Sequence, residues 1–252
     1  SELERSALDE RRGKRLWFSE EVEEAPKPKL PWECVSGKTG TIKVGKQDVR
    51  TLSIVINVEK LDNGAQPIIT ASFREDRPNE VTFKTYSAKG GAEMESCVLS
   101  STMGNYSRCR LLWLKDEIVD SRKLWPDYSG HEFVWTPDYS QDRVLKSADG
   151  TLTVAITPSE TDLNAAKVEP SWWHFDGRVA TQYWRKYAGT VKSPIKVRVN
   201  GRARYYGQAT LLPGGIAYEN FEIIETYEPG TESVFGVTLQ TPAQMGWKID
   251  KK

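Results

Sequence analysis

The chain has 252 residues, of which 38% are hydrophobic and 28% are charged, a composition typical of soluble globular proteins. Its 35 lysines and arginines balance its 35 aspartates and glutamates, which disfavours a general attraction to nucleic acid or to a membrane surface. No segment approaches the roughly 20 apolar residues that span a bilayer. We therefore predict no nucleic-acid partner and no membrane partner.

Residues 1–32 are predicted to form an N-terminal arm that ends in a proline-rich linker, EEAPKPKLPW. The charged first thirty residues do not resemble a signal peptide. Three cysteines, Cys34, Cys97 and Cys109, are an odd number without CxxC spacing, which predicts free thiols. Free thiols favour the cytoplasm over an oxidising compartment. The sequence otherwise leaves the compartment and the oligomeric state open.

Residues 33–252 are predicted to form a single β-sandwich domain. Turn signals recur at short intervals, and the segments between them alternate polar and apolar residues or run apolar, beginning at 41–60. This pattern is typical of an antiparallel β-sandwich of the jelly-roll or concanavalin A-like type. Helical signals are sparse, and a capping box from Thr157 to Glu160 predicts one short helix. The predicted turns lie at Asn63-Gly64, Lys89-Gly90-Gly91, Asp149-Gly150, Asn200-Gly201, Pro213-Gly214-Gly215 and Pro229-Gly230.

Residues 189–215 concentrate cations and aromatic rings in what the dipeptide Asn200-Gly201 predicts to be one hairpin. Because alternate residues of a strand share a face, Val197 and Val199 are expected in the core. The side chains expected on the opposite, open face are Lys196, Arg198 and Asn200 before the turn, and Arg202, Arg204, Tyr206 and Gln208 after it.

Alternation also predicts the faces of three other segments. It turns Tyr106, Arg108 and Arg110 toward an open or concave surface. It groups Gln182 with Trp184.

In the segment 219–222, alternation places Asn220 and Glu222 together, and the three-residue spacing is expected to send Glu219 and Glu222 to opposite faces. A second concentration of aromatic rings, PSWWHFDG, surrounds His174 and includes Trp173. Two tryptophans beside a titratable group suggest the wall of a pocket, although a lone histidine is more often structural.

A polyhydroxylated anionic ligand requires three kinds of group. Arginine guanidiniums bind its anionic groups, aromatic rings pack against its apolar patches, and amides bind its hydroxyl groups. The alternative is a solvated outer face, on which cations keep a sheet soluble. The predicted architecture and surface chemistry resemble those of the broad group of concanavalin A-like and jelly-roll carbohydrate-active proteins, without the motif of any one family. We therefore predict a saccharide ligand, and an acidic one.

The favoured function is an enzyme, a lyase that acts on an acidic saccharide. Arginine would neutralise the uronate carboxylate and acidify the neighbouring C–H, and histidine or tyrosine would transfer the proton. The predicted catalytic residues are His174, Tyr206 and, for hydrolysis, Glu222. The predicted substrate-binding residues are Tyr106, Arg108, Arg110, Trp173, Gln182, Trp184, Arg204 and Asn220.

Three alternatives stay open: a glycoside hydrolase that uses glutamate or aspartate, a non-catalytic carbohydrate-binding or assembly module, and a lipocalin-like binder of a small molecule. Nucleotide-binding and common hydrolase motifs are absent from the sequence. The two histidines, His131 and His174, fit no metal-binding spacing. We predict no cofactor and no catalytic metal, and leave open a structural calcium ion held by loop oxygens.

Overall fold

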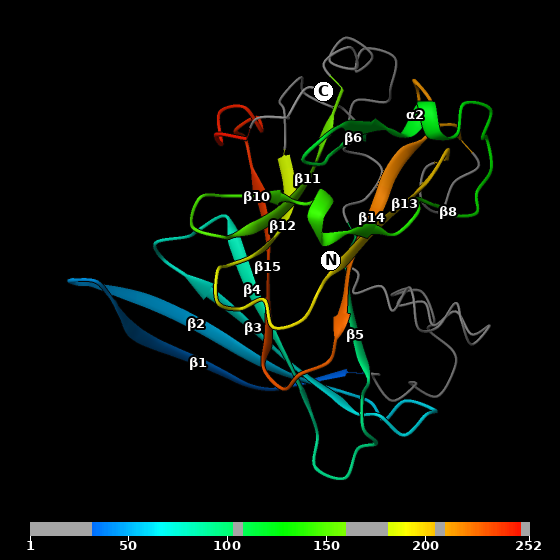
Figure 1. Ribbon diagram of the computed structural model, residues 1–252. Coiled ribbons are helices and arrows are strands. Elements are labelled where there is room, and N and C mark those ends of the chain that lie inside the picture. The colour runs from blue at the N-terminus through cyan, green and yellow to red at the C-terminus, as the bar shows by residue number, and fades with distance from the viewer. Residues whose placement is uncertain (1–31, 103–107, 160–180, 205–209, 248–252) are drawn as a thin grey trace.

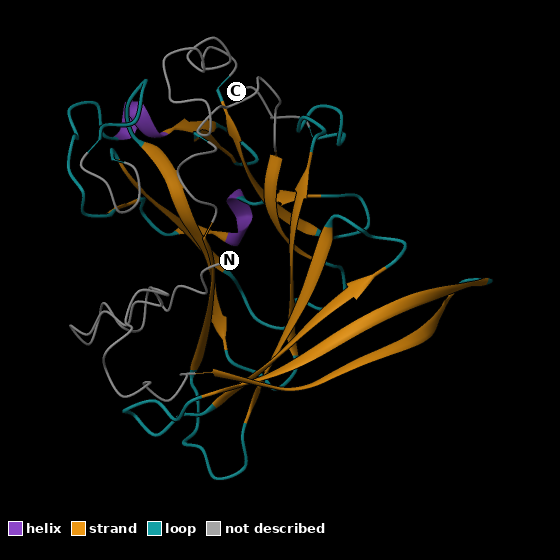
Figure 2. Cartoon of the chain, turned by 180° about the vertical axis from the view of Figure 1, so that it is seen from behind, coloured by secondary structure: helices purple, strands orange, loops and turns teal. Residues whose placement is uncertain are grey.

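The computed structural model describes residues 32–102, 108–159, 181–204 and 210–247, and strands dominate these residues (Figures 1 and 2). All strand pairs within these described ranges are antiparallel and belong to two sheets, so the prediction of an all-β, sandwich-like fold is confirmed. The arm predicted over residues 1–32 lies almost wholly outside the described residues. No helix among the described residues is long and apolar enough to cross a lipid bilayer.

The larger sheet has ten strands in the described part of the chain. Its order is β1 (Trp32–Val44), β2 (Gln47–Val58), β3 (Pro67–Arg74), β4 (Glu80–Ser87), β15 (Thr231–Thr238), β12 (Thr181–Lys186), β11 (Leu152–Pro158), β6 (Cys109–Trp113) and β7 (Ile118–Asp120), with β10 (Leu145–Lys146) paired to β11.

The smaller sheet has five strands among the described residues. Its order is β5 (Ser96–Thr102), β14 (Ala217–Thr226), β13 (Lys196–Arg202) and β8 (Val134–Trp135), with β9 (Tyr139–Ser140) also paired to β13. The described helices are short: α2 (Ser121–Leu124) and the 3-10 turn η2 (Gln141–Arg143). The predicted capping box fails, because Thr157 and Pro158 end strand β11, and the rest of that predicted helix lies outside the described residues.

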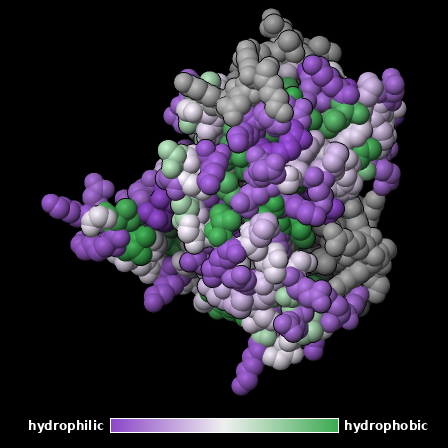
Figure 3. Space-filling view, viewed as in Figure 1, coloured by the Kyte–Doolittle hydropathy of each residue, from purple (hydrophilic) through white to green (hydrophobic). Residues whose placement is uncertain are grey.

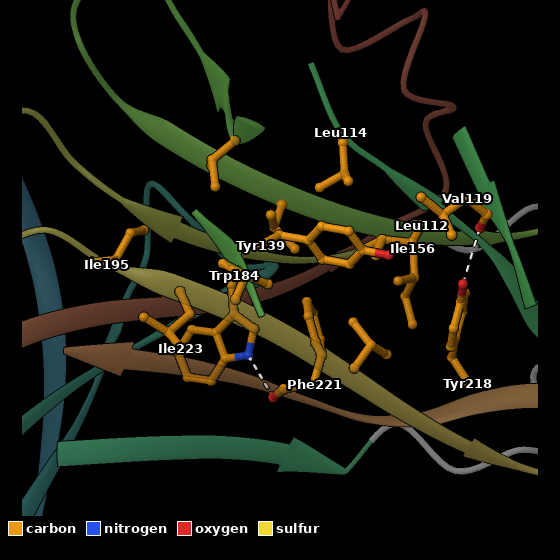
Figure 4. Close-up of a cluster of buried hydrophobic side chains, with 14 of the residues drawn as sticks. Leu112, Leu114, Val119, Tyr139, Ile156, Trp184, Ile195, Tyr218, Phe221 and Ile223 are labelled. Atoms are coloured by element: carbon orange, nitrogen blue, oxygen red, sulfur yellow. Dashed lines mark hydrogen bonds between the residues drawn. The ribbon is translucent and has the colours of Figure 1, made fainter. Parts of the chain in front are cut away.

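Trp184 joins the two sheets. Its side chain is 1% exposed and lies edge-on to Phe221 of β14 and to Phe235 of β15. Its indole Nε1 donates a hydrogen bond of 3.2 Å to the carbonyl oxygen of Phe221, across the gap between the sheets (Figure 4). An aromatic ring that packs and also satisfies its polar atom stabilises one arrangement of the sheets over others.

The smaller sheet covers only part of the larger one. One cross-strand row runs outward from Trp184 through Phe235, Val81 and Phe73 to Leu52. The exposed fraction rises along this row from 1% at Trp184 to 42% at Phe73 and 40% at Leu52. The core therefore thins toward β1 and β2, which project from the body as a long hairpin with apolar side chains at its surface (Figures 1 to 3).

Lys186 is buried in this core and forms an ion pair between the sheets. The alternation that groups it with Trp184 on one face of β12 turns both side chains inward. Its Nζ lies 2.6 Å and 2.5 Å from the two carboxylate oxygens of Glu225 on β14, and 3.5 Å from Ser233 Oγ. Burial raises the pKa of the Glu225 carboxyl, while the ammonium group of Lys186 opposes that rise.

Most of the predicted turns are present, and one is not. Gly64, Gly90, Gly150, Gly214, Gly215 and Gly230 have the positive φ angles expected of turn glycines. Asn200-Gly201, however, is not a hairpin turn, because β13 continues through it to Arg202. The pairing with β14 shifts between Asn200 and Gly201, which makes this point a β-bulge. A Cβ atom at Gly201 would collide with the carbonyl oxygen of Ala217, so glycine is required here by the close approach of two backbones.

The inter-sheet ion pair generates a prediction about stability. Lys186→Met should lower the free energy of unfolding by about 3–5 kcal/mol at neutral pH, because it leaves the Glu225 carboxylate buried without its cation. Urea unfolding monitored by tryptophan fluorescence measures this loss. The double variant Lys186→Met, Glu225→Leu should recover most of it, since neither charge then remains.

The pH dependence of the single variant is the control. Without Lys186 the folded-state pKa of Glu225 should rise further above its unfolded value of about 4.3. Stability should then be greatest at acid pH and fall as the pH rises through the window between the two values, because the folded state binds the proton more tightly. A loss that is independent of pH would show that packing, and not the unpaired charge, is responsible.

Candidate functional site

The side of the smaller sheet that faces away from the core carries a layer of paired polar side chains. Alternation turns Val197 and Val199 of β13 into the core, as predicted, and both are fully buried. The opposite side, which we call the polar face, consists of Arg198, Asn200 and Arg202 of β13 and Glu219, Asn220 and Glu222 of β14. Five of these six side chains are buried and only Arg198 is partly exposed, so this face is not the open surface that the sequence predicts for Asn200 and Arg202.

The β-bulge determines which residues of β14 reach the polar face. Tyr218 and Phe221 both belong to the core, although they are three positions apart and regular alternation would turn them to opposite faces. The extra residue between them is Glu219, because Asn220 pairs with Asn200 and Tyr218 pairs with Gly201. Glu219 binds Arg202, so Glu219 and Glu222 lie on the same face. The prediction of opposite faces is wrong, because regular alternation does not hold across a bulge.

Two arginine–glutamate pairs flank the polar face. Arg198 Nε donates to Glu222 Oε2 at 2.6 Å, and Arg202 donates from Nε and Nη2 to the two oxygens of Glu219. Glu222 is fully buried, while the Arg198 side chain is 20% exposed. Such charge-assisted pairs are strong when water is excluded.

Each guanidinium also lies over an aromatic ring. Arg198 Cζ is 4.4 Å from the ring centroid of Trp135, and Arg202 Cζ is 4.6 Å from that of Phe133. Because the ring faces attract cations, this stacking adds to the ion pairs and fixes the plane of each guanidinium. Trp135 belongs to β8, so the edge strand of the sheet helps to order the face.

Two asparagines occupy the centre of the polar face. Asn200 Oδ1 accepts hydrogen bonds from the backbone N–H and from Nδ2 of Asn220, both at 3.1 Å. Asn200 Nδ2 and Asn220 Oδ1 have no hydrogen-bond partner among the described residues, and both side chains are fully buried. One donor and one acceptor therefore lie on neighbouring strands without a partner, an arrangement that costs free energy unless something satisfies both atoms.

Arg108 and Arg110 do not line an open surface, contrary to the prediction. Both are fully buried. Leu112 and Leu114 are core residues, so alternation along β6 places Arg110 on the inner side. Arg110 Nη2 donates to the carbonyl oxygens of Pro213 and Gly215, at 2.6 Å and 3.0 Å, and thereby fixes the turn before β14.

The other predicted binding residues are dispersed. Gln182 and Trp184 share a face as predicted, but both are buried, Trp184 in the centre of the core. Gln182 Nε2 lies 3.7 Å from Cys109 Sγ. Arg204 Nε donates to the carbonyl oxygen of Ser129 at 2.9 Å. Of the predicted site residues that the structure describes, only Asn220 and Glu222 meet on the polar face.

Four predicted residues lie outside the described residues, namely His174, Trp173, Tyr106 and Tyr206. No group of three or more histidine, cysteine, aspartate or glutamate side chains among the described residues could hold a metal ion. Among the described residues, Cys34 and Cys109 are not part of a disulfide.

Sequence reasoning missed a second polar cluster, on the outer side of the larger sheet. Glu80 of β4 accepts hydrogen bonds from Tyr183 at 3.0 Å, Tyr187 at 2.6 Å and Arg185 at 2.7 Å. The ring of Tyr183 reaches Glu80 across β15 because residue 236 is glycine, where a Cβ atom would collide with that ring. Burial raises the pKa of Tyr183 and of Tyr187. With three donors on one carboxylate, this cluster is suited to fastening β4 to β12 rather than to proton transfer.

The Arg198–Glu222 pair can be tested by a double-mutant cycle with Arg198→Met and Glu222→Gln. We expect a coupling energy of about 1.5–3 kcal/mol, because the bond is charge-assisted and one partner is fully buried. Lys43→Met and Asp48→Asn form the control cycle. That pair joins exposed side chains and should couple by only about 0–1 kcal/mol. Equal coupling in the two cycles would contradict the desolvated character of the polar face.

Comparison with known proteins assigns no residue of this site. The chain matches no protein-family model, no curated protein and no solved structure. We therefore infer a function from the contacts within the polar face.

Proposed function

We propose that the protein binds a saccharide on the polar face of the smaller sheet. The observation that carries this proposal is the pair of unpartnered amide atoms, Asn200 Nδ2 and Asn220 Oδ1, on a face bordered by two aromatic residues. A sugar hydroxyl can accept from the first atom and donate to the second at once. The two aromatic rings hold the guanidiniums of Arg198 and Arg202 in place beside these amides.

The extent of pairing on this face supports binding as its primary role. Glu219 and Glu222 are each held by an arginine, and each arginine is held over a ring. Side chains locked in this way are pre-organised, which lowers the entropy cost of binding a flexible glycan. Because both asparagines are fully buried, binding also requires that they become exposed. The donor and the acceptor at the centre of this layer are the two atoms that a bound hydroxyl group would satisfy.

Glycoside hydrolysis is the second candidate, and the β-bulge favours it. The bulge brings Glu219 and Glu222 to one face of the sheet. Two carboxyl groups that face one bound sugar are what most glycoside hydrolases use. One of the two carboxyl groups would have to be protonated, so this reaction requires that a bound sugar separate one arginine–glutamate pair.

The lyase reaction stays a prediction. Two of the arginines assigned to charge neutralisation, Arg108 and Arg110, are buried away from the polar face, and the two residues assigned to proton transfer, His174 and Tyr206, lie outside the described residues. The lipocalin-like alternative likewise stays a prediction.

Binding can be tested with a glycan array followed by calorimetric titration of the best ligand. Asn220→Ala should weaken binding by about 10- to 100-fold, since it removes a hydrogen-bond acceptor that no other side chain replaces. Asn57→Ala, on β2 of the other sheet, is the matched control and should leave affinity unchanged. Far-UV circular dichroism confirms that both variants are folded. If Asn220→Ala binds as well as the unchanged protein, the polar face is not the site.

Hydrolysis is tested separately, with the glycan that binds. Glu219→Gln and Glu222→Gln should each lower turnover at least 100-fold if the two carboxyl groups act as acid and base. Proton NMR of the first product distinguishes inversion from retention at the anomeric carbon. Binding without any release of reducing ends would leave the first proposal standing and remove the second.

A further inference from the structure

We infer that the saccharide bound by the polar face is electrically neutral, and not acidic as the sequence predicts. This inference rests on the proposed function and specifies its ligand class. It follows from the way in which the cations of β13 are used within the fold.

The three cations of β13, namely Lys196, Arg198 and Arg202, are matched by carboxylates of the same chain. Arg198 binds Glu222 at 2.6 Å, and Arg202 binds Glu219 through two hydrogen bonds. Lys196, at the start of the same strand, lies 3.8 Å from the carboxylate of Asp138. The row of positive residues in the sequence is therefore a row of ion pairs in the structure.

A uronate carboxylate would gain little from these pairs. To bind Arg198 or Arg202 through the same guanidinium edge, it would have to displace a glutamate that is already buried and hydrogen-bonded there. The exchange replaces one charge-assisted bond by another, and it leaves the displaced glutamate unpaired in a region from which water is excluded. The two like charges would also repel each other.

The two amides at the centre of the face also favour a neutral ligand over an acidic one. A carboxylate has only acceptor atoms, so it could satisfy Asn200 Nδ2 but would repel the neighbouring Asn220 Oδ1. A hydroxyl group donates and accepts, and so satisfies both atoms. An ordered water molecule has the same capacity, and a neutral sugar can take its place without loss of a hydrogen bond.

The test compares neutral and acidic oligosaccharides of equal length and linkage, such as oligogalactose and oligogalacturonate, by calorimetric titration at 50 mM and 300 mM NaCl. We expect the neutral member to bind at least tenfold more tightly than its uronate counterpart, with affinity that hardly changes with salt. Tighter binding of the uronate, weakened by salt, would overturn the inference and leave the proposed function intact. If neither these sugars nor any glycan on the array binds, the proposed function fails and the inference fails with it.

A variant that removes one carboxylate of the polar face should gain affinity for the uronate, which can be measured directly. Glu222→Gln leaves Arg198 without its carboxylate, so affinity for the uronate should rise at least tenfold above that of the unchanged protein. Arg198→Met, which removes the cation, should show no such gain. If Glu222→Gln does not fold, the double variant Arg198→Met, Glu222→Met replaces it. That variant should keep the neutral preference, and a switch to the uronate would overturn the inference.

Discussion

The close approach of β13 and β14 at Gly201 is the constraint on which the polar face depends. Because residue 201 has no side chain, the Ala217 carbonyl can lie where a Cβ atom would be, and the ladder takes up one extra residue on β14. That residue is Glu219. Without the bulge, Tyr218 and Phe221 could not both reach the core, and Glu219 and Glu222 could not both pair with arginines on the other side of the same sheet.

Ion pairs inside this protein connect strands that hydrophobic packing alone would leave free to slide. Lys186 and Glu225 join the two sheets, and Arg198 and Glu222 join two neighbouring strands of one sheet. A buried pair contributes little net stability relative to a well-packed apolar pair. Its value is that a shift in register by one residue would leave charges buried and unpaired, which excludes the shifted arrangement.

The sequence predicts the strands well and the faces less well. Glycine turns and alternating segments predict antiparallel sheets, since both signals depend only on neighbours along the chain. The faces depend on what covers each strand, and that is set by distant residues. Arg110 is an example, because its neighbours in β6 alternate regularly, yet the carbonyl oxygens that bury it belong to Pro213 and Gly215. The bulge could not be recognised from the sequence either, because the dipeptide Asn-Gly is typical of a hairpin turn. Only the register with β14 reveals that Gly201 accommodates a neighbouring backbone.

The long hairpin of β1 and β2 has a consequence for how this protein behaves at high concentration. β1 is the last strand of its sheet among the described residues, and its residues 34–44 are exposed. Another extended chain could form hydrogen bonds with its outer row of backbone N–H and C=O groups and so add a strand to the sheet. The charge of Lys38 disfavours such pairing. The irregular pairing between Cys34 and Ser36 does so as well, because it changes the local twist of the strand. Protection of this edge against pairing with other chains is thus separate from the packing that stabilises the core.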